Sequence, residues 1–186
     1  MLSSIFQKLS PAAEKKLLIL AIATFILAGS CMVHFDTLLK NDAAPLGIIS
    51  FELAKTLDCS TQILDSWKTT TGAMQSAEWS LWFDYIFIIT YTVLLCLVIH
   101  RVRRTVWTNR ESLAYRFGIV MIRVVVWAGI LDMVENFALL QLFYGDLEPH
   151  WSTLAFVTAM IKFICIGLGI LYVLIGLLTA GIKKIT

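Results

Sequence analysis

The sequence predicts an all-α integral membrane protein, a four-helix bundle with an additional amphipathic helix between its first two transmembrane segments. Hydrophobic residues make up 59% of the 186 positions and charged residues only 15%, and the mean hydropathy is +0.81. Such a chain is too apolar for an ordinary surface in water. A bilayer core about 30 Å thick needs roughly 20 apolar residues per helix. Four stretches satisfy this, so we expect one membrane domain over 1–186 with spans at about 17–35, 81–99, 117–144 and 153–182.

The first span is preceded by a helix-start pattern. Ser10 is suited to cap the helix, Pro11 to occupy its first position, and Glu14 to lie in its early turns. From Leu17 to Phe35 the span contains no Asp, Glu, Lys or Arg. The other three spans contain few charged residues, namely Asp84, Arg123, Asp132, Glu135 and Lys162.

The segment between the first two spans is too long for a simple turn and has a helical pattern. Asn41 to Pro45 is typical of a helix start, and apolar residues then recur at roughly helical spacing. We therefore expect one amphipathic helix at about 45–67. Glu52 and Lys55 lie on its less apolar sides, where they can cover the end of the bundle.

Four tryptophans fall near this same end of the predicted bundle: Trp67, Trp79, Trp82 and Trp151. Tryptophan is enriched where a membrane meets water. The pattern therefore predicts an aromatic belt at this boundary.

Positive charges gather on one side of the predicted bundle. Lysines and arginines precede the first span, fill the loop at 100–116 and follow the fourth span, while the opposite side is rich in Asp and Glu. Positive loops stay on the cytoplasmic side during insertion. This predicts that both termini are cytoplasmic. We expect the basic loop to contact membrane lipids rather than nucleic acid.

The charged residues inside the spans, apart from Arg123, are expected to form one site. Asp132, Glu135 and Asn136 are spaced i, i+3 and i+4, so they share one helix face. Counting from the helix ends places residues of two other spans at a similar depth. The candidate ligand-binding residues are Asp84, Tyr91, Asp132, Glu135, Asn136 and Lys162, with Glu52 and Lys55 above them.

Three interpretations of this site are open. Lys162 can pair with Asp132 or Glu135 as a purely structural network. The excess of carboxylates over lysine can instead form a ligand or ion site that binds a cation, a proton or a lipid amine. A carboxylate could also act as acid or base in catalysis. No GxSxG, HExxH or P-loop pattern supports catalysis, and the sequence indicates no particular metal or cofactor.

Glycines in the fourth span favour close helix packing. Gly169 and Gly176 are seven residues apart and lie on nearly the same face. Small residues let helix backbones approach closely in membranes. We expect this face to contact another helix, either within the bundle or in a partner, which could be another membrane protein or a second copy.

Three segments carry a resemblance to a family of small bacterial membrane proteins: PLGIISFELAKT at 45–56, FDYIF at 83–87 and GILDMVEN at 129–136. The resemblance implies a bacterial inner membrane location and supplies no activity. From the residues we favour a non-enzymatic protein that binds a ligand, lipid or ion, or that is an accessory subunit of a larger complex. The alternative is an enzyme acting on a lipid-soluble substrate with Asp132 or Glu135 as acid or base.

Overall fold

The computed structural model describes residues 10–185, and it gives no side-chain detail for Pro11 or for 182–185. This part of the chain is helical and contains no strand. Its helices are α2 (Pro11–Asp36), α3 (Ile48–Glu52), α4 (Leu57–Lys68), α5 (Ala73–Thr105), α6 (Leu113–Phe143) and α7 (Pro149–Ile185). Four of them, α2, α5, α6 and α7, are long and apolar enough to cross a membrane. The predicted fold class is confirmed.

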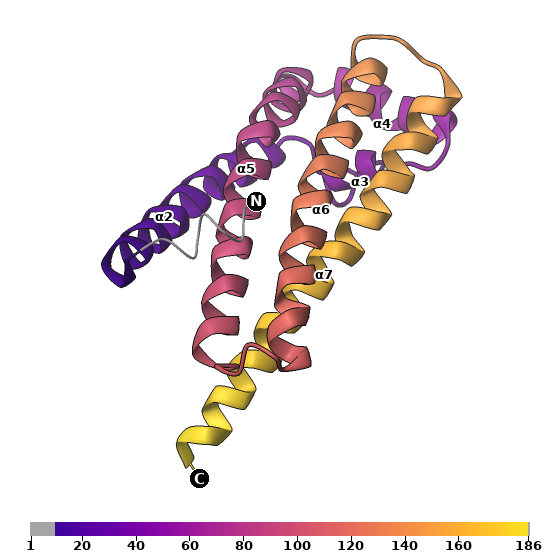
Figure 1. Cartoon of the computed structure of the whole chain (residues 1–186). Coiled ribbons are helices and arrows are strands. Elements are labelled where there is room, and N and C mark those ends of the chain that lie inside the picture. The colour runs from indigo at the N-terminus through magenta and orange to yellow at the C-terminus, as the bar shows by residue number, and fades with distance from the viewer. Residues whose placement is uncertain (1–9, 186) are drawn as a thin grey trace.

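The long helices are not arranged as an even square. α5, α6 and α7 pack closely together, whereas α2 lies on the far side of α5 and packs mainly on that helix (Figure 1). The short helices α3 and α4 sit at the end of the bundle where α6 connects to α7. We call this the α3–α4 end. The loop between α5 and α6 lies at the opposite end.

The predicted start of the first span is confirmed in detail. Ser10 has an extended backbone, and its Oγ accepts a hydrogen bond from the N–H of Ala13 at 3.2 Å. At this end Glu14 pairs with Arg104 of α5, with 3.3 Å between Oε2 and Nη1. The pair ties the start of α2 to the basic end of α5. Lys8, Lys183 and Lys184, which also contribute to the predicted basic side, lie outside the described side chains.

The later spans are longer than predicted. α5 begins at Ala73 rather than near 81, directly after Gly72, whose φ of +83° suits glycine. The additional turns pack at the α3–α4 end, where Ala73 and Ala77 are buried. A count of apolar residues tracks the bilayer core and therefore misses helix that continues beyond it.

The prediction of one amphipathic helix over 45–67 is wrong, because the chain forms two helices there. Thr56 is extended, and its Oγ1 accepts from the N–H of Cys59 at 3.3 Å, so it caps a new helix. The predicted start at Asn41 is instead a turn, with Asn41 Oδ1 accepting from the N–H groups of Ala43 and Ala44. The break lets α3 and α4 fold against each other.

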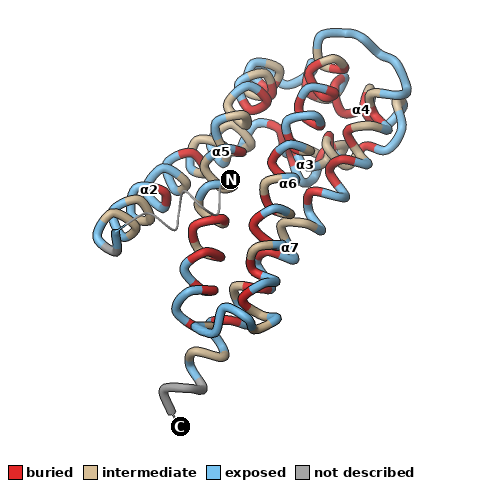
Figure 2. Tube along the Cα trace, in the orientation of Figure 1, coloured by how far each residue is buried: buried red, intermediate tan, exposed pale blue. Residues whose placement is uncertain are grey.

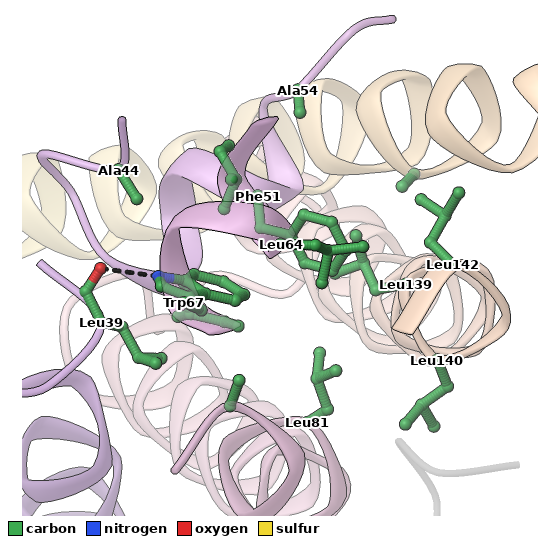
Figure 3. Packing of buried hydrophobic residues seen from close by; sticks show 14 of the residues in the cluster. Leu39, Ala44, Phe51, Ala54, Leu64, Trp67, Leu81, Leu139, Leu140 and Leu142 are labelled. Carbon is green, nitrogen blue, oxygen red and sulfur yellow. Dashed lines mark hydrogen bonds between the residues drawn. The ribbon is translucent and has the colours of Figure 1, made fainter. Parts of the chain in front are cut away.

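The prediction that Trp67 belongs to an aromatic belt is also wrong. Its side chain is fully buried, and its Nε1 donates to the backbone oxygen of Leu39 at 2.9 Å (Figure 3). The ring also packs edge-on against Phe51, with 5.5 Å between centroids. Trp79 and Trp82 do lie exposed. Trp67 therefore holds the two short helices together instead of facing the membrane boundary.

Burial follows the helix contacts. Buried residues line the facing sides of α5, α6 and α7 and the α3–α4 end, while α2 is exposed along much of its length (Figure 2). Gly176 packs against Val102 and Trp107, and Gly169 against Val125. Gly169 and Gly176 thus make contacts inside the bundle. The expected contact with a partner through them stays a prediction.

Candidate functional site

The centre of the site is one face of α6. Glu135 and Asn136 follow Asp132 by about one helical turn. All three are buried, with at most 4% of each residue exposed. Gly129, one turn before Asp132, lies where a Cβ would press on Thr92, so α6 approaches α5 closely here. The predicted shared face is confirmed, and it points into the bundle.

Lys162 of α7 lies at the centre of the buried charges. Its Nζ is 2.6 Å from Asp132 Oδ1, 2.8 Å from Glu135 Oε1 and 3.2 Å from Glu52 Oε2. An ammonium has three hydrogens to donate, and each has a carboxylate acceptor here. Lys162 is only 4% exposed, so its positive charge is balanced inside the protein.

α5 adds two polar side chains to the same region. Tyr91 donates from its hydroxyl to Asp132 Oδ2 at 2.8 Å. Asp84 accepts from the amide of Asn136 at 2.7 Å, and that amide also donates to the backbone oxygen of Leu81 at 3.2 Å. The two side chains lie two helical turns apart, so both reach α6 from one face of α5.

Glu52 reaches the site because α3 is anchored to the end of α2. Asp36 Oδ1 accepts from the N–H of Ile48, the first residue of α3, at 2.8 Å. Gly47 has a φ of +62°, and a Cβ there would collide with the Asp36 carboxylate. This connection directs the last residue of α3 toward Lys162. Burial raises the pKa of the Glu52 carboxyl above its usual value and outweighs the opposing attraction to Lys162.

Lys55 does not join the site, contrary to the prediction. It is exposed in the segment between α3 and α4, and its Nζ lies 5.9 Å from the centre of the Phe156 ring. The prediction assumed that one helix carries both Glu52 and Lys55. Because α3 ends at Glu52, the chain turns away before Lys55.

Carboxyl groups outnumber amines in the cluster. Four carboxyl groups, those of Glu52, Asp84, Asp132 and Glu135, surround one ammonium. The Oε2 atom of Glu135 is buried and has no hydrogen-bond partner. Among the described residues, no three His, Cys, Asp or Glu side chains are placed to hold a metal ion. The geometry therefore gives no support to the interpretation as a metal site.

A cavity of about 550 Å³ opens beside the charged cluster. α5 forms its floor, and α2 and α7 form its two walls. Such a volume falls within the range of about 300–1,000 Å³ found for small-molecule pockets. Its rim includes Val33 and Ile170, which are exposed, so the cavity opens sideways from the bundle.

The cavity has a polar end and an apolar remainder. Charged residues cluster at the end near α3, where Asp36, Glu52, Asp84, Asp132 and Lys162 line the wall. The rest is lined by apolar and aromatic side chains. They are Phe25, Met32, Val33, Ile48, Ile49, Phe87, Tyr91, Leu94, Leu95, Val98, Phe163, Ile166 and Ile170.

Sequence reasoning missed the cavity and its apolar walls. Phe25 of α2 stacks on Phe87 of α5, with ring centroids 5.5 Å apart, and both face the cavity. An aromatic residue in a membrane span is normal, so neither position stood out. Asp36 was also missed, although an acid at the end of an apolar helix next to a glycine-containing turn is a usable signal.

The two candidate acid–base residues are poorly placed to meet a substrate. Both oxygens of Asp132 accept hydrogen bonds, one from Lys162 and one from Tyr91. Glu135 does not line the cavity. The enzymatic alternative stays a hypothesis that no feature of this geometry favours.

Fold and site together define a multi-pass helical membrane protein with a charged cluster beside a side-opening, largely apolar cavity. Comparison with protein families, curated proteins and solved structures found no match. The case for function therefore depends on the cavity and the charges.

Proposed function

We propose that this is a protein of the bacterial inner membrane, with both termini cytoplasmic, that binds a lipid-soluble amphipathic molecule in the cavity between α2 and α7. The observation that carries the proposal is the division of the cavity into a charged end and a long apolar part. An amphipathic molecule has the same division. The side opening gives such a molecule a route from the lipid.

The height of the cavity supports an amphipathic ligand oriented like a membrane lipid. Asp84 and Val98 both line it and are separated by roughly 20 Å along α5. The charged end lies near α3, at the acidic end of the bundle, and the apolar part extends toward the middle of the helices. A polar head near the membrane boundary and a tail inside the lipid depth fit this layout.

Binding is favoured over catalysis because Asp132, the candidate acid–base residue that lines the cavity, already uses both carboxyl oxygens. Asp132 is held by Lys162 and Tyr91, and the structural role of that network is compatible with a ligand site at its edge. An accessory-subunit role remains an alternative that native mass spectrometry can reveal, since a protein partner adds a mass unlike that of a lipid.

The test is native mass spectrometry of the protein extracted gently from its own membrane, with extracted lipids identified in parallel. Ile166→Trp places a large side chain in the cavity wall. Ile164→Trp is the matched control, because Ile164 lies on the same helix, is 60% exposed and does not line the cavity. We expect a bound small molecule in the wild type and in Ile164→Trp, and its loss in Ile166→Trp. Equal occupancy in all three would contradict the proposal.

A further inference from the structure

The ionisable side chains at the polar end of the cavity indicate the chemistry of the ligand's head group. This inference rests on the proposed function. We infer that the ligand carries a cationic amine head, without a phosphate or carboxylate, on an apolar chain. The inference follows from three features: the hydrogen bonds that Lys162 already makes, the open Asp84 Oδ1, and the excess of carboxyl groups over amines.

Lys162 is the one cation among the described residues that line the cavity, and it is already committed. Its ammonium donates to Asp132, Glu135 and Glu52. An anionic head group would need it to release one of these partners. A phosphate would then also lie beside carboxylates, which is unfavourable in a poorly solvated site. The committed lysine therefore disfavours anionic ligands.

An open acceptor atom lies at the polar end instead. Asp84 uses Oδ2 for the amide of Asn136, and the described residues give its Oδ1 no hydrogen-bond partner, whereas the Glu52 carboxyl is engaged by Lys162 and Glu135. Asp84 and Glu52 both line the polar end. A head group that donates a hydrogen bond can meet Asp84 Oδ1. An ammonium provides up to three N–H donors.

The excess of carboxyl groups distinguishes an amine head group from a neutral alcohol. The cluster has four carboxyl groups against one lysine, so three of the acids need a proton or another cation for the charges to balance. A positive head would offset this excess, whereas a hydroxyl would only donate one hydrogen bond. Charge-assisted hydrogen bonds are also roughly twice as strong as neutral ones. The geometry thus selects a charged donor.

The apolar part of the cavity sets the remainder of the ligand. Phe25 and Phe87 stack beside it, and Leu94, Ile166 and Ile170 continue the wall away from the charges. No charged side chain lines this part. A flexible alkyl or prenyl chain fits such a wall, and its burial supplies affinity in proportion to the apolar area covered.

The test compares three probes that differ only in the head group: dodecylamine, dodecanol and dodecanoate. Each is titrated into the protein in nanodiscs of phosphatidylcholine, and binding is read by native mass spectrometry. We expect the wild type to bind dodecylamine about tenfold more tightly than dodecanol, and dodecanoate most weakly. Equal or tighter binding of dodecanol or dodecanoate would overturn the inference.

A pair of charge variants assigns the effect to the cavity. Asp84→Asn keeps an oxygen that can accept from Asn136 but removes an ionisable carboxyl group from the cavity wall. Asp65→Asn is the control, because Asp65 lies on α4, is exposed and pairs with Lys68. We expect Asp84→Asn to lose most of the preference for the amine over the alcohol and Asp65→Asn to keep it. If Asp84→Asn keeps the full preference, the inference is wrong; if it does not fold, the ratio in the wild type decides.

Failure of this inference differs from failure of the proposed function. If dodecanol competes as well as dodecylamine, and Ile166→Trp abolishes binding of both, the cavity binds an amphipath but the head need not be cationic. If Ile166→Trp and Ile164→Trp bind every probe as the wild type does, the cavity is not the binding site and both proposals fail.

Discussion

Lys162 Nζ and Asp132 Oδ1 lie 2.6 Å apart between two neighbouring spans, and neither residue is more than 4% exposed. In a low-dielectric interior, such a pair is stable only while both partners remain. Removing one leaves an uncompensated charge, which costs far more than the pair itself contributes.

Lys162→Met should therefore destabilise the protein by about 3–5 kcal/mol, because it leaves three buried carboxyl groups without their shared donor. The control is Lys68→Met, which breaks an exposed pair with Asp65 and should cost about 0–1 kcal/mol. Thermal unfolding in detergent measures both. If Lys162→Met is as stable as the wild type, the network has no structural role.

The Asp36–Gly47 contact should be essential for placing α3. Gly47→Ala both strains a positive φ and drives a Cβ into the Asp36 carboxylate, whereas Gly145→Ala strains a positive φ of +98° in open space. The difference between the two variants isolates the collision. We expect Gly47→Ala to cost at least about 1 kcal/mol more in thermal unfolding. Equal losses would mean that Asp36 adjusts freely.

The glycines of α7 should differ in what they tolerate. A Cβ at Gly176 would collide with Val102, while Gly167 has no neighbour within 4 Å. Gly176→Val should lower stability by about 1–3 kcal/mol through overpacking, and Gly167→Val should be close to neutral. Thermal unfolding tests the difference, and size-exclusion chromatography adds a second reading. A change of oligomeric state in Gly176→Val without loss of stability would instead favour a partner at this face.

Stability should fall as the pH rises through the titration of Glu52. Burial raises the pKa of this carboxyl above its ordinary value of 4.5, so the folded chain holds the proton more tightly than the unfolded chain. The contribution of Glu52 is then fully present below about pH 4.5 and is lost toward the raised pKa, by up to about 1.4 kcal/mol per pH unit. Comparing unfolding of wild type and Glu52→Gln across pH isolates this group. The wild type should weaken relative to the variant as the pH rises; parallel curves would contradict the assignment.

The native cysteines can test the proposed orientation. Cys59 lies exposed on α4, and Cys96 is buried in α5. A membrane-impermeant maleimide should label Cys59 in intact spheroplasts, and Cys59→Ser should abolish that signal. Thr108→Cys in the Cys59→Ser background places a thiol in the basic loop at the opposite end, where labelling should require permeabilisation. The reverse pattern would place the termini outside the cytoplasm.

Helical periodicity accounts for what the sequence could predict of this site. Asp132, Glu135 and Asn136 share a face by spacing alone, and counting residues from the helix ends brought Asp84 and Lys162 to their depth. The errors lie in the segment between α2 and α5. There, Lys55 turns away and Trp67 becomes core because the path of the chain depends on distant contacts, such as the bond from Trp67 to Leu39.

The cavity was unpredictable for a related reason. Its walls are ordinary apolar residues of α2 and α7, and the space exists because α2 packs on α5 without closing against α7. Single-helix patterns carry no information on such a spacing. Only the arrangement of several helices in space produces it.

Two of the three acids that pair with Lys162 lie on α6, and this placement also bears on how the chain enters a membrane. α6 and α7 are joined by residues 144–148 alone, so the two form a hairpin. A lysine at the centre of a lone helix costs about 2.5–3.5 kcal/mol to insert, and each acid adds a similar cost. Entering together as a hairpin, α6 and α7 neutralise one another from the start, which makes this pair a natural unit of insertion at the translocon.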